Sequence, residues 1–184
     1  MADNHHRTSG FTLVEVLAVV FILALMITAA SANFGRFLPE ARAEQAARGL
    51  LDNLDLARVA AIAHGREYLV QVDLDKGRYQ TLTPWTANGR PARLEEEKIS
   101  LGWESLPDGV IFIGAVDPLG DIQEEGVFEI LYSPYGDSSD LYFHLSAGVE
   151  EAFSVTVRIT GITGMASILE GHILPSPVNQ GDFD

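Results

Sequence analysis

One apolar stretch near the N-terminus constrains this chain more than any other feature of its sequence. Residues 11–32 contain no Lys, Arg or Asp and a single Glu, Glu15. As a helix rising 1.5 Å per residue, the stretch would be about 33 Å long, enough to cross the roughly 30 Å hydrocarbon core of a bilayer. Nothing later in the 184 residues is comparable, so we expect one transmembrane helix over residues 11–32.

The charges on either side of this stretch predict its orientation. Residues 1–10 are polar and carry Arg7, whereas acidic residues predominate after the stretch. Positive charge before a span favours a cytoplasmic N-terminus. We therefore expect a single-pass protein of the inner membrane, with the C-terminal part of the chain in the periplasm.

The overall charge and the absence of cysteine exclude several classes of function. The formal net charge is −14, from 26 acidic and 12 basic residues, and such a surface repels phosphate backbones. We therefore expect no nucleic-acid partner. The chain has no cysteine, which excludes disulfides and thiol catalysis.

Glu15 is the residue that separates the possible interpretations of the apolar stretch. The small residues Ala30-Ser31-Ala32 would suit cleavage of an ordinary secretory signal, and an uncleaved membrane helix is a second possibility. Neither possibility accounts for Glu15. An acidic side chain near the centre of a membrane helix costs about 2.5–3.5 kcal/mol, and less near an end, so such residues usually have a partner.

Residues 9–15, with the sequence SGFTLVE, resemble the processing site of type IV pilins and of the pseudopilins of type II secretion. The resemblance implies that residues 1–10 are a leader peptide. It implies that a prepilin peptidase cuts between Gly10 and Phe11 and methylates the new amine of Phe11. It also implies that Glu15 pairs with the N-terminal amine of a neighbouring subunit, since opposite charges attract strongly in low dielectric.

Residues 33–65 are predicted to continue the helix as an amphipathic segment. Gly35 and Pro39 suggest a kink or a loosened turn, because proline lacks an N–H group. His64 and Gly65 mark the end of the helix. The apolar stripe consists of Ala47, Leu50, Leu51, Leu54, Ala61 and Ile62, and the polar face of Glu44, Arg48, Asp52 and Asp55.

Beyond Gly65 the apolar spacing changes from that of a helix to that of strands. Short alternating runs predict strands at residues 68–72, 78–82, 110–113, 127–132, 141–145, 153–159 and 165–169. The connections at residues 84–109 and 114–126 are predicted to be surface loops, and the tail from Gly171 is predicted to be irregular. Residues 66–184 should therefore form a periplasmic, β-rich head of antiparallel sheets packed beside the helix.

Two segments of the head resemble the GspH/FimT family. Residues 56–70, LARVAAIAHGREYLV, are similar to its helix-to-first-strand junction, and residues 132–139, YSPYGDSS, are similar to its late turn. The resemblance implies an α+β, pilin-like fold in which a long N-terminal helix packs on a β-sandwich of antiparallel sheets. Some FimT-like pilins bind DNA through a basic C-terminal region, but this chain has no Lys or Arg after Arg158.

This family resemblance implies a structural role rather than an enzymatic one. The favoured function is that of a minor pseudopilin of type II secretion, with a FimT/FimU-like minor pilin of a type IV pilus as the alternative. The implied partners are other major and minor pseudopilins, the prepilin peptidase and the inner-membrane secretion platform. A secreted periplasmic β-sandwich that binds a ligand is the remaining hypothesis.

Metal and cofactor chemistry finds little support in the sequence. Asp73 with Asp75, and Asp137 with Asp140, could ligate calcium, but aspartates in turns are the better interpretation. We therefore expect no metal, no cofactor and no catalytic residue.

Two histidines and two tryptophans are the remaining candidates for functional residues. His144 is predicted on the polar side of a strand and His172 in the tail, and neither belongs to a recognisable ligand set. Trp85 and Trp103 are candidate interface residues, although packing within the head is an equally good explanation.

Overall fold

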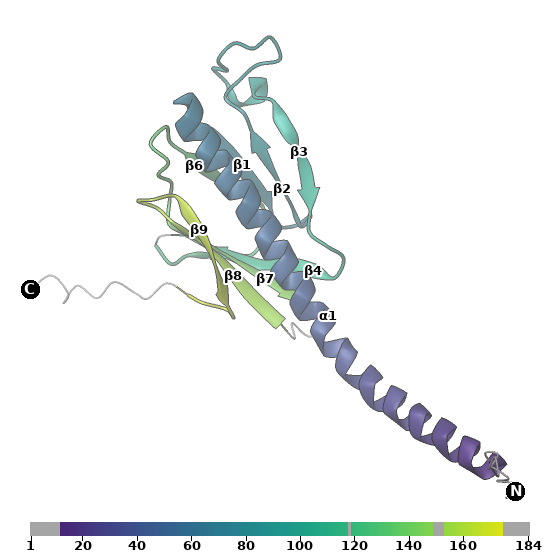
Figure 1. Ribbon diagram of the computed structural model, residues 1–184. Helices are drawn as coiled ribbons and strands as arrows, with labels where there is room; N and C mark the ends of the chain where they lie inside the picture. The colour runs from purple at the N-terminus through teal and green to yellow at the C-terminus, as the bar shows by residue number, and fades with distance from the viewer. Residues whose placement is uncertain (1–11, 118, 149–152, 175–184) are drawn as a thin grey trace, which may run out of the picture. The chain divides into compact units, whose positions relative to one another are not determined.

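A long helix and a two-sheet head make up the described part of the chain (Figure 1). The computed structural model describes residues 12–117, 119–148 and 153–174, without the side chains of residues 29–37. Helix α1 runs over Leu13–His64 and includes Pro39. The chain divides into two compact units, residues 1–38 and residues 39–184, so the second half of α1 belongs to the head.

The first sheet of the head has four antiparallel strands in the order β3-β2-β1-β6. Strands β1 (Tyr68–Asp73) and β2 (Arg78–Leu82) form a hairpin. Strand β3 (Ser100–Ser105) pairs with β2, and β6 (Val127–Tyr132) pairs with β1 along its whole length. The short 3-10 helix η1 (Glu95–Glu97) lies in the connection between β2 and β3.

The second sheet has five antiparallel strands in the order β5-β4-β7-β8-β9. These strands are β4 (Val110–Val116), β5 (Ile122–Gln123), β7 (Leu141–Ala147), β8 (Phe153–Thr160) and β9 (Met165–Glu170). Every residue of β7 is buried, so both faces of this sheet are covered at its centre.

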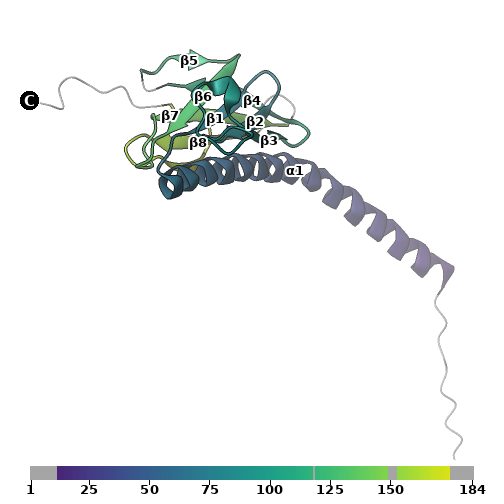
Figure 2. The same cartoon turned by 90° about the horizontal axis from the view of Figure 1, so that it is seen from above.

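Small side chains on the second half of α1 allow it to lie close against the sheets. Its buried residues recur every three or four positions, the spacing of one helix face. They are Ala43, Ala46, Ala47, Leu50, Asn53, Leu54, Ala57 and Ala61. The apolar members join residues from both sheets in one hydrophobic core, and Figure 2 shows this part of α1 lying along the strands. The predicted α+β arrangement, a long helix packed on antiparallel sheets, is therefore confirmed.

The predicted strands agree with the structure at all seven positions, but two strands were missed. Strand β3 lies in the predicted loop at residues 84–109. Its six residues are all exposed and its register shifts opposite β2, so it has no clear alternation of apolar and polar residues. Strand β5 has only two residues, too few for any pattern.

Helix α1 continues from Leu13 to His64 through Gly35 and Pro39, so these residues do not divide it into two helices, and the kink expected there stays a prediction. A single proline removes one N–H donor from a helix and need not end it. The predicted end of the helix at His64 is confirmed. On the apolar stripe, Leu50 and Leu54 are fully buried, whereas Ile62 remains 46% exposed.

Candidate assembly site

The predicted processing positions Gly10 and Phe11 lie outside the described residues. Glu15 is described, and its exposed side chain sits in the first turn of α1. Its role in pairing with a neighbouring subunit is not tested by a single chain and stays a prediction.

Thr12 and Glu15 form a reciprocal cap at the start of α1. The backbone N–H of Glu15 donates to the Thr12 hydroxyl oxygen at 3.3 Å, and the backbone N–H of Thr12 donates to Glu15 Oε2 at 3.4 Å. This is the capping-box arrangement, although the Glu15 N–H is shared with the Thr12 carbonyl oxygen at 3.0 Å. The sequence analysis missed this local role, although a threonine followed three residues later by a glutamate is its signature.

The residues on both sides of Glu15 present large apolar side chains to their surroundings. Twelve of them between Leu13 and Ile27 are exposed by 50–78%. Apolar surface of this extent is unfavourable in water, so this half of α1 requires a lipid or protein environment.

The predicted transmembrane span over residues 11–32 stays a prediction. No helix within the described residues combines the length and the apolar character that a membrane crossing requires.

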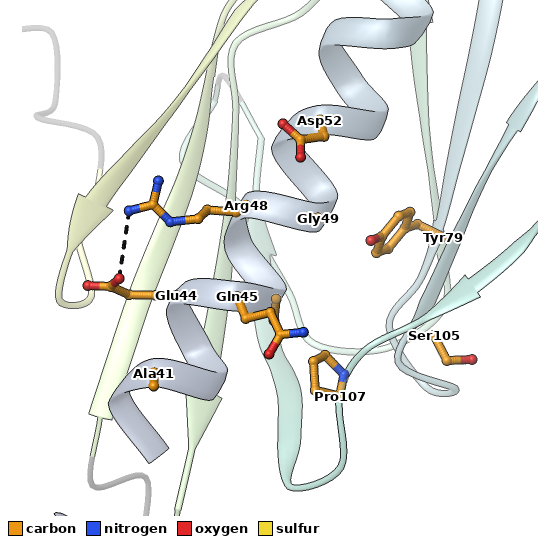
Figure 3. Close-up of a pocket in the computed structure, with 10 residues that line it drawn as sticks. Ala41, Glu44, Gln45, Arg48, Gly49, Asp52, Tyr79, Ser105 and Pro107 are labelled. Carbon is orange, nitrogen blue, oxygen red and sulfur yellow. Dashed lines mark ion pairs between the residues drawn. The ribbon is translucent and has the colours of Figure 1, made fainter. Parts of the chain in front are cut away.

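An open groove of about 500 Å³ separates the head half of α1 from strands β2 and β3. Figure 3 shows Tyr79 reaching from β2 towards Gly49, while Arg48 points away and forms an ion pair with Glu44. A Cβ atom on Gly49 would lie 2.8 Å from the Tyr79 hydroxyl, so any larger residue here would force the Tyr79 side chain to shift. Burial, together with the nearby carboxylates of Glu104 and Asp52, raises the pKa of Tyr79 to about 12.

Arg58 is a residue whose structural role the sequence analysis missed. Its Nε donates to the carbonyl oxygens of Thr163 at 2.7 Å and Gly136 at 3.3 Å, and so ties two turns of the head to α1. The turns are in close contact, because a Cβ atom on Gly164 would lie 2.0 Å from the Gly136 carbonyl oxygen. No spacing in the sequence could have indicated that one arginine joins these two distant turns.

Asp73 and Asp75, the first pair considered for calcium, accept hydrogen bonds from neighbouring groups of the protein. Burial would raise the pKa of Asp73, but hydrogen bonds from the Lys76 backbone and the Arg78 side chain, with the charges of both residues, lower it overall. Arg78 Nε lies 3.1 Å from Asp73 Oδ2. Asp75 accepts from the backbone N–H of Gly126 at 3.2 Å.

The second aspartate pair behaves in the same way. Asp137 accepts a hydrogen bond from the Ser133 hydroxyl, and Asp140 accepts from the backbone N–H of Gly161 at 3.0 Å. No group of three or more potential metal ligands occurs among the described residues. The Asp137 contact is local to one turn, whereas Asp140 joins its segment to the turn that follows β8.

His144 faces away from the core, as predicted for the polar side of β7, yet it is only 1% exposed. The tail covers this side chain. The ring of His172 packs edge-on against the ring of His144, with 3.9 Å between the ring centroids. The Thr156 hydroxyl of β8 donates to the Gly171 carbonyl oxygen at 2.7 Å and so holds the start of the tail in place. Burial, and then the charge of His172, lowers the pKa of His144 to about 4.

Both candidate tryptophans pack against arginines of the head. The Arg78 guanidinium lies 4.2 Å from the Trp103 ring centroid, and that of Arg66 lies 5.6 Å from the Trp85 ring centroid. The sequence left open an interface role or packing within the head, and these contacts are of the second kind. A single chain does not test the interface role.

Two sequence comparisons match this chain to known proteins. Residues 5–31 match the family described as the prokaryotic N-terminal methylation motif. The type II secretion system protein H of Aeromonas hydrophila is 30% identical over 108 residues, which are 59% of this chain and 57% of that relative. The chain thus matches little more than half of the length of that protein.

Two solved structures share the fold. The minor pseudopilin EpsH of Vibrio cholerae matches with a TM-score of 0.53 and 20% identity, over 72% of this chain and 97% of EpsH. The type IV minor pilin FimU of Pseudomonas aeruginosa matches with a TM-score of 0.50 and 14% identity, over 74% of this chain and 94% of FimU. At these identities the likeness establishes the fold alone.

Proposed function

We propose that this chain, a type IV pilin-like protein with a prepilin-type N-terminus, is a minor pseudopilin of a type II secretion system. As such it is a structural subunit of the pseudopilus, which helps to export folded proteins across the outer membrane. One combination of observations carries the proposal. A methylation motif precedes a head with the fold of a minor pseudopilin, and 108 residues of the chain are 30% identical to a type II secretion protein H.

The proposal assigns a sequence of steps to the N-terminal residues. Residues 1–10 are the leader, and a prepilin peptidase cuts between Gly10 and Phe11 and methylates the amine of Phe11. Residues 11–32 then anchor the subunit in the inner membrane, with the head in the periplasm. The exposed apolar side chains of this half of α1 support burial in lipid before assembly and against other subunits afterwards.

Glu15 is the proposed assembly residue. Its hydrogen bond from the Thr12 backbone is long, at 3.4 Å, so the carboxylate can still accept the methylated amine of an adjacent subunit. The pairing would neutralise two charges in an apolar environment, where each alone would be costly. Assembly of this kind needs no catalytic residue, and the proposed partners are other pseudopilins and the inner-membrane secretion platform.

Two substitutions separate the charge of Glu15 from its capping role. Glu15→Gln retains a capping side chain but removes the charge, whereas Thr12→Ala removes the cap but keeps the charge. We expect Glu15→Gln to abolish incorporation into filaments and Thr12→Ala to preserve it, measured by cross-linking and pull-down of co-expressed pseudopilins. Normal incorporation of the Glu15→Gln chain would show that the charge pair is not used.

The mature N-terminus provides a separate test of processing. Mass spectrometry of the chain purified from membranes should find a methylated Phe11 as the first residue. A chain that begins at Asn33 would instead establish ordinary signal cleavage after Ala32 and a secreted β-sandwich protein.

The likeness to FimU supports the alternative of a minor pilin in a type IV pilus, since its TM-score of 0.50 is close to the 0.53 of EpsH. Disruption of the gene decides between the two. We expect loss of a secreted exoprotein from the culture medium with surface piliation intact. Loss of pili with normal secretion would favour the alternative.

A further inference from the structure

A concavity with three arginines lies in the head beyond the C-terminal end of α1. It has a volume of about 940 Å³, and the charged residues that line it are Arg66, Arg90, Arg93 and Glu97. The connection between β2 and β3 forms most of its wall, and Figure 1 shows this connection near the end of α1. We call these three arginines and their hollow the arginine concavity.

The arginine concavity is unusual in a chain of this charge. The whole sequence has 12 basic and 26 acidic residues, and yet a quarter of the basic side chains line one hollow. All three arginines are exposed, and none forms an ion pair among those found in the described residues. Like charges placed around one concavity repel each other, so a bound anion would relieve that repulsion.

The one carboxylate in the lining is directed at the backbone. Glu97 Oε2 accepts hydrogen bonds from the backbone N–H groups of Arg93 at 2.9 Å and Leu94 at 3.4 Å. Nearby Glu95 accepts instead from the Gln71 side chain at 2.9 Å, on the surface of the four-stranded sheet. The guanidinium groups of Arg90 and Arg93 therefore remain available to an external ligand.

A smaller hollow continues this surface. It has a volume of about 310 Å³, shares Arg66 and Ala92 with the arginine concavity, and adds Lys98 and Glu67 to the lining. The two hollows together offer four basic side chains on adjoining walls. A ligand that spans both would need several carboxylates at short spacing.

We propose that the arginine concavity binds a short, carboxylate-rich segment of a partner protein. A planar guanidinium binds a carboxylate through two parallel hydrogen bonds, and the volume lies in the range of pockets that enclose small ligands. Glu95 and Glu96 beside the concavity, with the net charge of −14, disfavour a long polyanion such as DNA, which would also have to approach these carboxylates. The binding chemistry is independent of filament assembly.

Fluorescence anisotropy with the full chain in non-ionic detergent micelles tests this proposal. The probe is a short fluorescein-labelled peptide rich in glutamate, and the control probe has every glutamate replaced by glutamine. We expect the glutamate peptide to bind, the glutamine peptide not to bind, and the affinity to fall steeply as salt is raised. An oligothymidine of similar length should bind more weakly than the glutamate peptide.

The matched variants locate the binding. Arg90→Gln combined with Arg93→Gln should weaken peptide binding about tenfold or more, because charge-assisted hydrogen bonds are lost from exposed side chains. Arg48→Gln, an exposed arginine on α1 outside the concavity, should leave binding unchanged, and circular dichroism should show all variants folded. Failure of the peptide to bind, unchanged binding by the double variant, or tighter binding of oligothymidine would each overturn the proposal.

Discussion

The two halves of α1 are one helix with opposite relationships to the rest of the chain. Between Leu13 and Ile27 its large apolar side chains are exposed by half or more. Between Ala43 and Ala61 its buried side chains are mostly alanine, with Leu50 and Leu54 at the centre. The first half carries more apolar surface, yet the second half is the one that forms a hydrophobic core with the sheets.

This difference shows that large apolar residues do not by themselves mark the part of a helix that packs against the sheets. Alanine and glycine allow the head half to approach the sheets closely, as Gly49 does beside Tyr79. Large side chains suit the N-terminal half for lipid or, under the proposed function, for the helices of other subunits. Substitutions in the head half should therefore change the stability of the head, and those in the N-terminal half should not.

The largest expected change in the free energy of unfolding comes from a substitution in the turns that Arg58 holds against α1. Gly164→Ala should lower the free energy of unfolding of the head by about 4 kcal/mol or more, because an added Cβ meets the Gly136 carbonyl oxygen at 2.0 Å. Gly65→Ala is the matched control, since Gly65 has the same φ of 59° and nothing within 4 Å. It should cost only about 1 kcal/mol. Equal losses in urea unfolding of the two variants would contradict the steric explanation.

A pair of leucine substitutions tests the two halves of the helix directly. Leu50→Ala removes a fully buried side chain and should lower the free energy of unfolding of the head by about 3 kcal/mol. Leu23→Ala removes a side chain that is 52% exposed and should leave that free energy unchanged. Both should be followed by urea unfolding of the full chain in non-ionic detergent with head-specific tryptophan fluorescence. A similar loss in both variants would show that the halves fold as one unit.

The buried His144 predicts a pH dependence confined to the head. Its pKa is lowered from 6.5 to about 4, so the unfolded chain binds one more proton than the folded chain between these pH values. The free energy of unfolding should therefore fall as pH drops from about 6.5 to about 4, by about 3 kcal/mol from this residue. His144→Gln should remove that part of the pH dependence in chemical unfolding, whereas Arg48→Gln should keep it. An unchanged pH profile in His144→Gln would contradict the assignment.

Sequence patterns predicted those elements whose residues alternate regularly. The hairpin of β1 and β2, the strand β6 and the end of α1 all follow from spacing and turn residues. The all-exposed β3 could not be found, because an edge strand that buries neither face carries no periodic signal. The burial of His144 was missed for a different reason, because it depends on the tail, where His172 packs against its ring.

The candidate site was predictable only in its local part. The sequence around Glu15 indicates processing and assembly, and the structure adds the cap from Thr12. The role of Arg58 and the gathering of Arg66, Arg90 and Arg93 depend on tertiary contacts between segments far apart in the chain. Only a folded head brings those residues together.

The smallest expected effect belongs to the start of α1. Thr12→Ala removes the hydroxyl that accepts the backbone N–H of Glu15, and should destabilise the first turn of the helix by about 1 kcal/mol. Because this turn lies in the N-terminal half, the unfolding of the head should not change. Amide hydrogen exchange in detergent micelles would measure the effect at Glu15 and Val16, whose N–H groups bond to Thr12. Glu15→Gln is the matched variant because it keeps a capping side chain, so faster exchange there as well would mean that the charge of Glu15 also holds this turn.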